Sequence, residues 1–166
     1  IYKGLTMPSC VFGGTDWRAI ALGDSHASAL VTGLAKASAK PSDGVVQWTY
    51  SGCPFVSWMK QTPAKINKLG GNEYKCNEFI AWAKTQLETL PATVPVVLIS
   101  RYAQAALGQN EDRHMVEVPE VYFSKIYPSA TPEFLTEFSN HITESACALA
   151  SQRSVYMVRP IPEMGF

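Results

Sequence analysis

The sequence lacks the features that would place it in several common classes of protein. Its 14 Lys and Arg residues balance its 14 Asp and Glu residues, so no basic surface for nucleic-acid binding is predicted. It has no internal repeat, no Gly-rich phosphate loop and no apolar run near the roughly 18 residues of a membrane span. With 166 residues, 46% of them hydrophobic, the chain is expected to form one globular domain with a sizeable core.

The four cysteines include no Cys-x-x-Cys pair, which leaves zinc and thioredoxin-type chemistry poorly supported; we expect no metal and no other cofactor. An even number of cysteines allows two disulfides, in three pairings. We favour Cys53 with Cys76 and Cys10 with Cys147, because Cys76 opens the apolar stripe of a helix that follows the Cys53 loop. Four buried free thiols in a cytosolic protein are the alternative.

Short apolar runs alternate with helical patterns along the chain. Strands are predicted at residues 17–22, 44–50, 94–100 and 154–161, and helices at 27–37, 76–90 and 132–150, the last with Thr131 as its cap. Residues 55–71 are predicted to form a loop with room for a short helix, and residues 103–130 a long insertion that is functional or flexible. The alternation predicts a doubly wound, three-layer α/β/α fold with a parallel sheet.

One segment, Ala19 to His26, combines a predicted strand, a Gly-Asp-Ser-His turn and the start of a helix. Gly23 allows a sharp turn and places Ser25 near a helix N-terminus, where free N–H groups favour developing negative charge. A serine at that position can act as nucleophile and as oxyanion neighbour, although Asp24 and Ser25 are also good helix caps. Adjacent side chains diverge on a turn, so His26 is not expected to be the base for Ser25.

The carboxyl ends of the predicted strands carry the other candidate residues. These ends are Gly23-Asp24-Ser25, Ser51-Gly52-Cys53, Ser100-Arg101-Tyr102 and Pro160-Ile161-Pro162-Glu163. Ligands of doubly wound sheets bind outside such ends, so we expect the functional site there.

These segments, in this order, resemble the SGNH (GDSL-like) hydrolases. They resemble more closely the SGNH domains fused to membrane acyltransferase-3 proteins that O-acetylate bacterial surface polysaccharides. The resemblance rests on residues 22–27, the Gly52-Cys53-Pro54 loop with Cys76, Ser100-Arg101-Tyr102 and residues 158–163, and it covers nearly the whole chain. It implies a flavodoxin-like SGNH-hydrolase fold, a periplasmic or extracytoplasmic location and a membrane acyltransferase domain in the same parent chain.

The resemblance also implies roles for single residues. Ser25 would attack an acyl carbonyl, with its own N–H in the oxyanion hole and Asp24 supporting the site. Gly52 stands where the family offers a second N–H donor; a turn glycine is the alternative. Arg101 stands where the family normally has Asn, and its permanent donors suit an oxyanion or a substrate carboxylate, with a structural ion pair as the alternative.

The family's base and orienting acid come from an Asp-x-x-His motif after the last strand, and the sequence has none before Phe166. Neither His114 nor His141 has an Asp three residues earlier, so neither is a good substitute. The chain also begins at Ile1 rather than Met, and we expect it to be a processed or excised domain that lacks its C-terminal segment. Without a base, the 166-residue chain should be nearly inactive alone.

We therefore expect an O-acyltransferase that acts through an acyl-serine, with an acyl donor and a carbohydrate acceptor as partners. Tyr102, Tyr122, Phe123 and Tyr127 are candidates for stacking on sugar faces, with ordinary loop packing as the alternative. A carbohydrate acetyl esterase and a non-catalytic polysaccharide-binding scaffold of the same fold are the rival functions. A nucleotide or phosphate binder is less well supported, because Asp24 would sit where the phosphate binds.

Overall fold

The computed structural model describes residues 9–69, 71, 74–108 and 117–159, and these form an α/β domain with two sheets. The elements are β1 (Ser9–Gly13), β2 (Asp16–Gly23), α1 (Ser25–Lys36), β3 (Asp43–Thr49), β4 (Lys60–Gln61), α2 (Pro63–Lys68), α3 (Cys76–Thr89), β5 (Val96–Ile99), α4 (Tyr102–Leu107), β6 (Val121–Tyr122), α5 (Pro132–Ala150) and β7 (Val155–Met157). Within these ranges, no helix has the length and apolar character that crossing a membrane would require.

The main sheet has five strands in the order β1-β3-β2-β5-β7. The four predicted strands correspond to β2, β3, β5 and β7, and they are parallel to one another. The expected parallel sheet is nevertheless mixed, because β1 pairs antiparallel with β3 at the edge. The prediction missed β1 because four of its five residues are exposed, so its sequence shows no apolar alternation.

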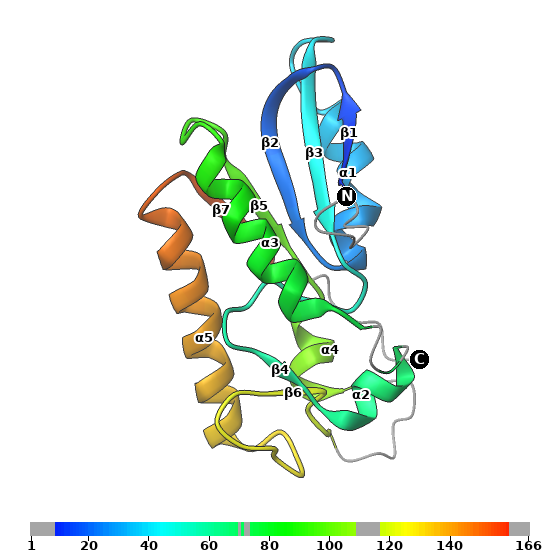
Figure 1. Cartoon of the computed structure of the whole chain (residues 1–166), viewed down its shortest axis with the longest axis vertical. Coiled ribbons are helices and arrows are strands. Elements are labelled where there is room, and N and C mark those ends of the chain that lie inside the picture. Colours follow the sequence, from blue (N-terminus) through cyan, green and yellow to red (C-terminus); the bar gives the residue numbers. More distant parts are fainter. Residues whose placement is uncertain (1–8, 70, 72–73, 109–116, 160–166) are drawn as a thin grey trace.

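The two faces of the sheet are covered by different helices, as Figure 1 shows. Alternate residues of a strand point to opposite faces. Ile20 of β2 belongs to the larger core, which includes Phe79 of α3 and Phe134 of α5, whereas its neighbour Ala21 packs with Val31 of α1. The domain thus has the expected three layers, with α1 on one face and α3 and α5 on the other.

The two segments expected to be irregular contain regular elements. Residues 55–71 hold β4 and α2, and residues 103–130 hold β6 and most of α4. The two short strands pair with each other, Lys60 opposite Tyr122 and Gln61 opposite Val121, and form a second, antiparallel sheet. The insertion is therefore tied to the loop after β3. Part of it, and the end of the predicted last strand, lie outside the described residues.

Of the two predicted disulfides, one is present. Cys53 and Cys76 are bonded, with their Cα atoms 5.5 Å apart. The pairing of Cys10 with Cys147 was wrong, because both are free and exposed. Cys10 lies on β1 at one edge of the sheet, and Cys147 lies on α5, which packs against β7 at the other edge.

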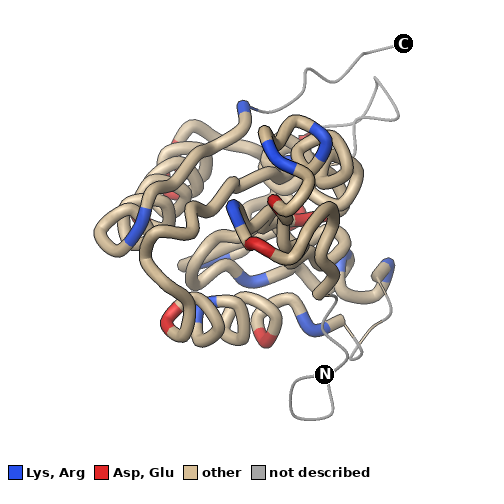
Figure 2. The backbone as a smooth tube through the Cα atoms, turned by 90° about the horizontal axis from the view of Figure 1, so that it is seen from above, with Lys and Arg blue, Asp and Glu red and all other residues tan. Residues whose placement is uncertain are grey.

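Charged residues are spread over the described part of the fold. Figure 2 shows acidic and basic residues interspersed along the helices and strands. This pattern agrees with the balanced composition of the sequence.

Candidate active site

Ser25 is the first residue of α1 and lies just beyond the carboxyl end of β2. The chain leaves β2 toward β3 on one side, and β5 is added on the other side, so β2 stands at the topological switch point of the sheet. Asp24 is the N-cap of the helix, and the Ser25 side chain is exposed. The capping role proposed as an alternative thus belongs to Asp24, which leaves Ser25 available for chemistry.

Gly23 holds the end of β2 close to β5. A Cβ atom at this position would lie 1.9 Å from the Ile99 carbonyl oxygen. Any side chain would therefore push the strands apart. The glycine sets both the sharp turn before Ser25 and the distance between the two strand ends.

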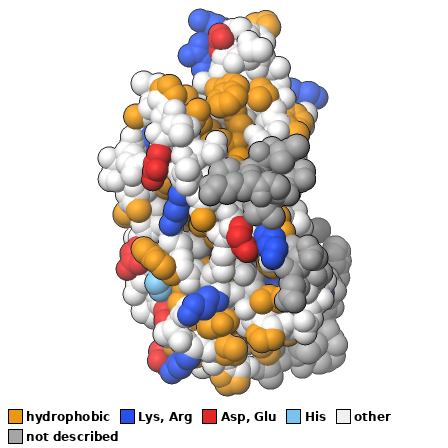
Figure 3. Space-filling view, viewed as in Figure 1, with side chains coloured by type: hydrophobic (Ala, Val, Ile, Leu, Met, Phe, Trp, Pro, Cys, Tyr) orange, Lys and Arg blue, Asp and Glu red, His pale blue; other side chains and the backbone are white. Residues whose placement is uncertain are grey.

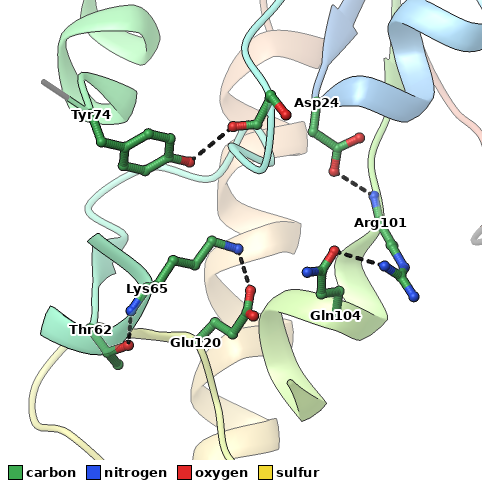
Figure 4. Close-up of polar contacts among 8 residues, drawn as sticks. Asp24, Thr62, Lys65, Tyr74, Arg101, Gln104 and Glu120 are labelled. Carbon is green, nitrogen blue, oxygen red and sulfur yellow. Dashed lines mark hydrogen bonds and ion pairs between the residues drawn. The ribbon is translucent and has the colours of Figure 1, made fainter. Parts of the chain in front are cut away.

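The Asp24 carboxylate joins the turn after β2 to the turn after β5. It is 3% exposed, and its two oxygens accept hydrogen bonds from the His26 N–H at 2.8 Å and the Arg101 N–H at 2.7 Å. Figure 4 shows the Asp24 side chain directed at Arg101. Two segments 77 residues apart in the chain are fixed to each other in this way.

Gly52 occupies a tight turn at the carboxyl end of β3. The Cys53 N–H donates to the Tyr50 carbonyl at 3.0 Å, and Gly52 has a φ of 67°, as the third residue of a type II turn requires. The turn explains why the residue is glycine. In the described part of the chain no acceptor binds the Gly52 N–H, so the turn also leaves a donor for the predicted oxyanion role.

Tyr74 and the disulfide hold this turn against α3. The Tyr74 hydroxyl donates to the Ser51 carbonyl at 3.2 Å, and the Lys75 N–H donates to the Tyr50 hydroxyl at 2.9 Å. Burial, followed by the nearby Tyr50 and Asp24, raises the pKa of Tyr74 well above its usual value. The hydroxyl therefore stays protonated and remains a donor at neutral pH.

Arg101 directly precedes α4, and its guanidinium donates to Gln104 Oε1 at 3.0 Å. This contact orients the side chain through a neutral amide on the next helical turn (Figure 4). The residue is half-buried and stands at the strand end next to Asp24. Its predicted part in the oxyanion hole stays a prediction.

A buried ion pair lies close to the Gly52 turn and was not expected from the sequence. Lys65 of α2 is only 5% exposed and pairs with Glu120, just before β6 (Figure 4). A Cβ on Gly52 would lie 3.7 Å from Lys65 Cε, so the Lys65 side chain packs directly under the turn. No local pattern could predict it, because its partners are 55 positions apart.

The described histidines do not complete a catalytic triad. His26 Nδ1 lies 3.5 Å from Asp24 Oδ1, and His141 stacks on Phe123 with ring centroids 4.0 Å apart. Within the residues that the structure describes, Ser25 Oγ has no hydrogen bond to either of them. His114 and Glu163 lie outside the described residues.

Most of the aromatic residues expected to stack on a sugar belong to the core. Tyr102, Phe123 and Tyr127 are 5–6% exposed, which favours the packing alternative for these three, and their role as substrate contacts stays a prediction. Burial raises the pKa of Tyr102 to about 12. Tyr122 is half-buried, with Lys60 Nζ 5.6 Å from its ring centroid, and its role as a substrate contact stays a prediction.

No cluster of three or more His, Cys, Asp or Glu side chains that could hold a metal ion occurs among the residues described here.

The fold and the site define an α/β protein with an exposed serine at the switch point of its sheet. The chain matches the family described as "SGNH domain (fused to AT3 domains)" over residues 2–166, and it belongs to this family. Searches of curated proteins and of solved structures found no match.

Proposed function

We propose that this chain is the catalytic domain of an O-acyltransferase that transfers an acetyl group to a sugar hydroxyl of a cell-surface polysaccharide or lipopolysaccharide. The supporting observation is the exposed Ser25 at the first position of α1, beside the Gly52 and Arg101 strand ends, in a chain of the SGNH family. We place the domain outside the cytoplasm, with a membrane acyltransferase domain of the same parent chain as its source of acyl groups.

The chemistry proceeds in two transfers. Ser25 Oγ attacks the acyl carbonyl carbon of the donor, its proton passes to a base, and the donor's leaving group departs with a proton, which leaves an acyl-serine. A sugar hydroxyl then attacks that ester, gives its proton to the base and takes the acyl group, and Ser25 regains its proton. The N–H groups of Ser25 and Gly52 would stabilise the oxyanion of both tetrahedral intermediates.

Two related functions differ from this proposal in one step each. An acetyl esterase forms the same acyl-serine but passes the acyl group to water. A non-catalytic scaffold forms no acyl-serine, and one observation favours it: among the described residues, no histidine is hydrogen-bonded to Ser25 Oγ.

A serine-directed fluorophosphonate probe, applied to the protein made from its complete gene, tests the nucleophile. We expect labelling of the wild type, no labelling of Ser25→Ala and full labelling of Ser139→Ala, which changes an exposed serine on α5. A folded wild type that is not labelled, or a Ser25→Ala protein that is, contradicts the enzyme and supports the scaffold. Mass spectrometry of the products then separates transfer from hydrolysis, since only transfer adds acetyl to the glycan.

A further inference from the structure

A cavity of about 610 Å³ lies between α3 and α5, and none of the residues assigned to the candidate active site lines it. Its lining is mostly apolar and includes the exposed ring of Trp58. The polar residues at the cavity include Lys60, Asn77, Lys84, Glu137 and His141. Figure 3 looks onto the α3 and α5 face, where lysine and histidine side chains border hydrophobic surface.

Trp58 is held outward by its neighbours. Its side chain is 70% exposed, and its φ of 59° is the one positive value among the described non-glycine residues. Ser57 and Met59 are both buried, and the Ser57 N–H donates to Ser145 Oγ at 2.8 Å. A bulky residue adopts this backbone conformation only when the surrounding structure imposes it, as such anchoring does here. The result is a large flat ring presented to solvent.

Two polar atoms in the cavity wall are buried: Glu137 Oε2 has no hydrogen-bond partner within the described structure, and His141 Nδ1 lies 3.6 Å from Glu144 Oε2. The other carboxylate oxygen of Glu137 accepts from the Ser124 N–H at 3.2 Å, which fixes the side chain. The His141 ring is fixed by its stacking on Phe123. Both side chains therefore form a fixed wall of the cavity, and their buried atoms are not open to a ligand.

Lys84 completes the arrangement. Its Nζ donates to Ser57 Oγ at 2.8 Å and lies 5.5 Å from the centroid of the Trp58 ring. The ammonium group is thereby held beside the indole, with protons left for a further acceptor. One wall of the cavity is thus aromatic, and its edge carries lysine donors.

We propose that this cavity is a carbohydrate subsite that binds one pyranose ring of the acceptor polysaccharide. The apolar C–H face of the ring packs on Trp58, and its hydroxyls accept from Lys84 Nζ. The identity of the ligand as part of the acceptor rests on the proposed function. The chain itself links the two sites, because Gly52 and Trp58 share one loop, and Cys76, bonded to Cys53, directly precedes Asn77.

The four tryptophans of the 166-residue chain provide a direct test. In ¹H–¹⁵N spectra each indole N–H gives one peak, and the Trp58→Phe variant identifies the Trp58 peak. We expect titration with the methyl glycosides of glucose, galactose, mannose and rhamnose to shift the Trp58 peak saturably for at least one sugar. Trp17, which is 40% exposed on β2, serves as the internal control and should not move.

Two variants sharpen the test. Trp58→Ala should weaken binding of the glycoside that shifts the Trp58 peak by on the order of tenfold, because it removes the stacking surface. Saturation-transfer NMR measures this change. Trp17→Ala should leave binding unchanged. If none of the four glycosides shifts the Trp58 peak, if Trp17 shifts equally, or if Trp58→Ala binds as well as the wild type, the proposal is overturned.

The same titration on Ser25→Ala separates this proposal from the proposed function. Sugar binding should persist in Ser25→Ala, because Ser25 does not line the cavity. Loss of probe labelling bears only on the nucleophile, and loss of the Trp58 response bears only on the subsite. A protein that binds sugar but is never labelled would keep the subsite as part of a scaffold.

Discussion

Two buried aspartates lie at opposite ends of the same pair of strands, and their partners differ. Asp43, at the start of β3, accepts from the Arg18 side chain at 2.8 Å and from the Lys40 N–H at 3.2 Å. Asp24, after the end of β2, accepts from the backbone N–H groups of His26 and Arg101. The first carboxylate neutralises a cation in a structural turn. The second positions two strand ends around Ser25.

The surroundings of the two aspartates differ in the same way. At the amino end of the sheet, Gly14 and Gly44 allow the backbone after β1 to pack closely against Ser42 and the start of β3. At the carboxyl end, Gly23, Gly52 and the Cys53–Cys76 disulfide shape the loops that carry the candidate catalytic groups. Glycines that allow close packing of the backbone therefore stabilise the fold at the amino end of the sheet. At the carboxyl end they help to position the loops that carry the candidate catalytic residues.

The largest effect is expected from Gly23→Ala at the carboxyl end. The new methyl group would meet the Ile99 carbonyl oxygen at 1.9 Å, so the central strands must separate, and we expect a loss of about 3 kcal/mol or more in the free energy of unfolding. Gly33→Ala is the control, because nothing lies within 4 Å of its Cβ and alanine favours the helix by about 0.5–1 kcal/mol. Urea unfolding measures both. Equal stability of the two variants would contradict the close approach at Gly23.

Loss of the disulfide should have the next largest effect. The Cys53–Cys76 crosslink joins residues 23 positions apart, and Cys53→Ser/Cys76→Ser removes it. We expect the free energy of unfolding to fall by about 3 kcal/mol. For a domain of this size the melting temperature should fall by roughly 6–12 °C. Cys10→Ser/Cys147→Ser changes two free, exposed thiols and should melt like the wild type. A reductant should reproduce the first result in the wild type and have no effect on the double Cys53/Cys76 variant.

The two aspartates can be compared directly by amide substitution. Asp24→Asn replaces one acceptor oxygen by a donor and leaves one buried N–H unpaired, which should cost about 1–3 kcal/mol in urea unfolding. It should also abolish fluorophosphonate labelling of Ser25, because the two strand ends are no longer fixed together. Asp43→Asn should lower stability but retain labelling. Labelling that survives in both variants would show that Asp24 is only a structural residue.

The smallest effect is expected for the pH dependence of the stability that the Asp43–Arg18 pair contributes at the amino end of the sheet. The hydrogen bond from Arg18 holds the pKa of Asp43 below its usual value of 3.8. A carboxyl whose pKa is lower in the folded state stabilises the protein above its unfolded pKa, and that contribution is lost as the pH falls through the folded value. The difference in the free energy of unfolding between wild type and Asp43→Asn should therefore have its largest value at pH 6 and decrease toward pH 2.5. Urea midpoints across this range check it, and a difference independent of pH would contradict the charged contact.

Helix starts show how much local pattern can predict. Thr131-Pro132 predicts the start of α5, and the Thr131 side chain accepts from the Phe134 N–H as a cap should. The same pair occurs at Thr62-Pro63, where the Thr62 side chain accepts from the Lys65 N–H and caps α2. Residues 55–71, predicted as a loop with room for a short helix, thus carry the same local helix-start signal. By contrast, no local signal marks β1, which is an exposed edge strand.

The candidate site was predictable in its parts but not in its connections. The order of motifs indicated Ser25, Gly52 and Arg101, and the parallel strands bring their ends together. The Asp24 contact with Arg101 and the Lys65 pair with Glu120 join residues 77 and 55 positions apart, so no spacing in the sequence could reveal them. The same holds for the cavity at Trp58, whose walls come from segments between residues 58 and 141.

By itself, the sequence determined the three layers, the main strands and helices and the position of a serine at the turn after the first parallel strand, because these depend on local periodicity, capping and turn residues. Only the tertiary structure decided which polar groups are buried against one another, which cysteines can meet and which aromatic rings remain open to solvent. Those outcomes depend on how distant segments pack, and the residues next to a given residue along the chain do not determine which residues contact it in the folded protein.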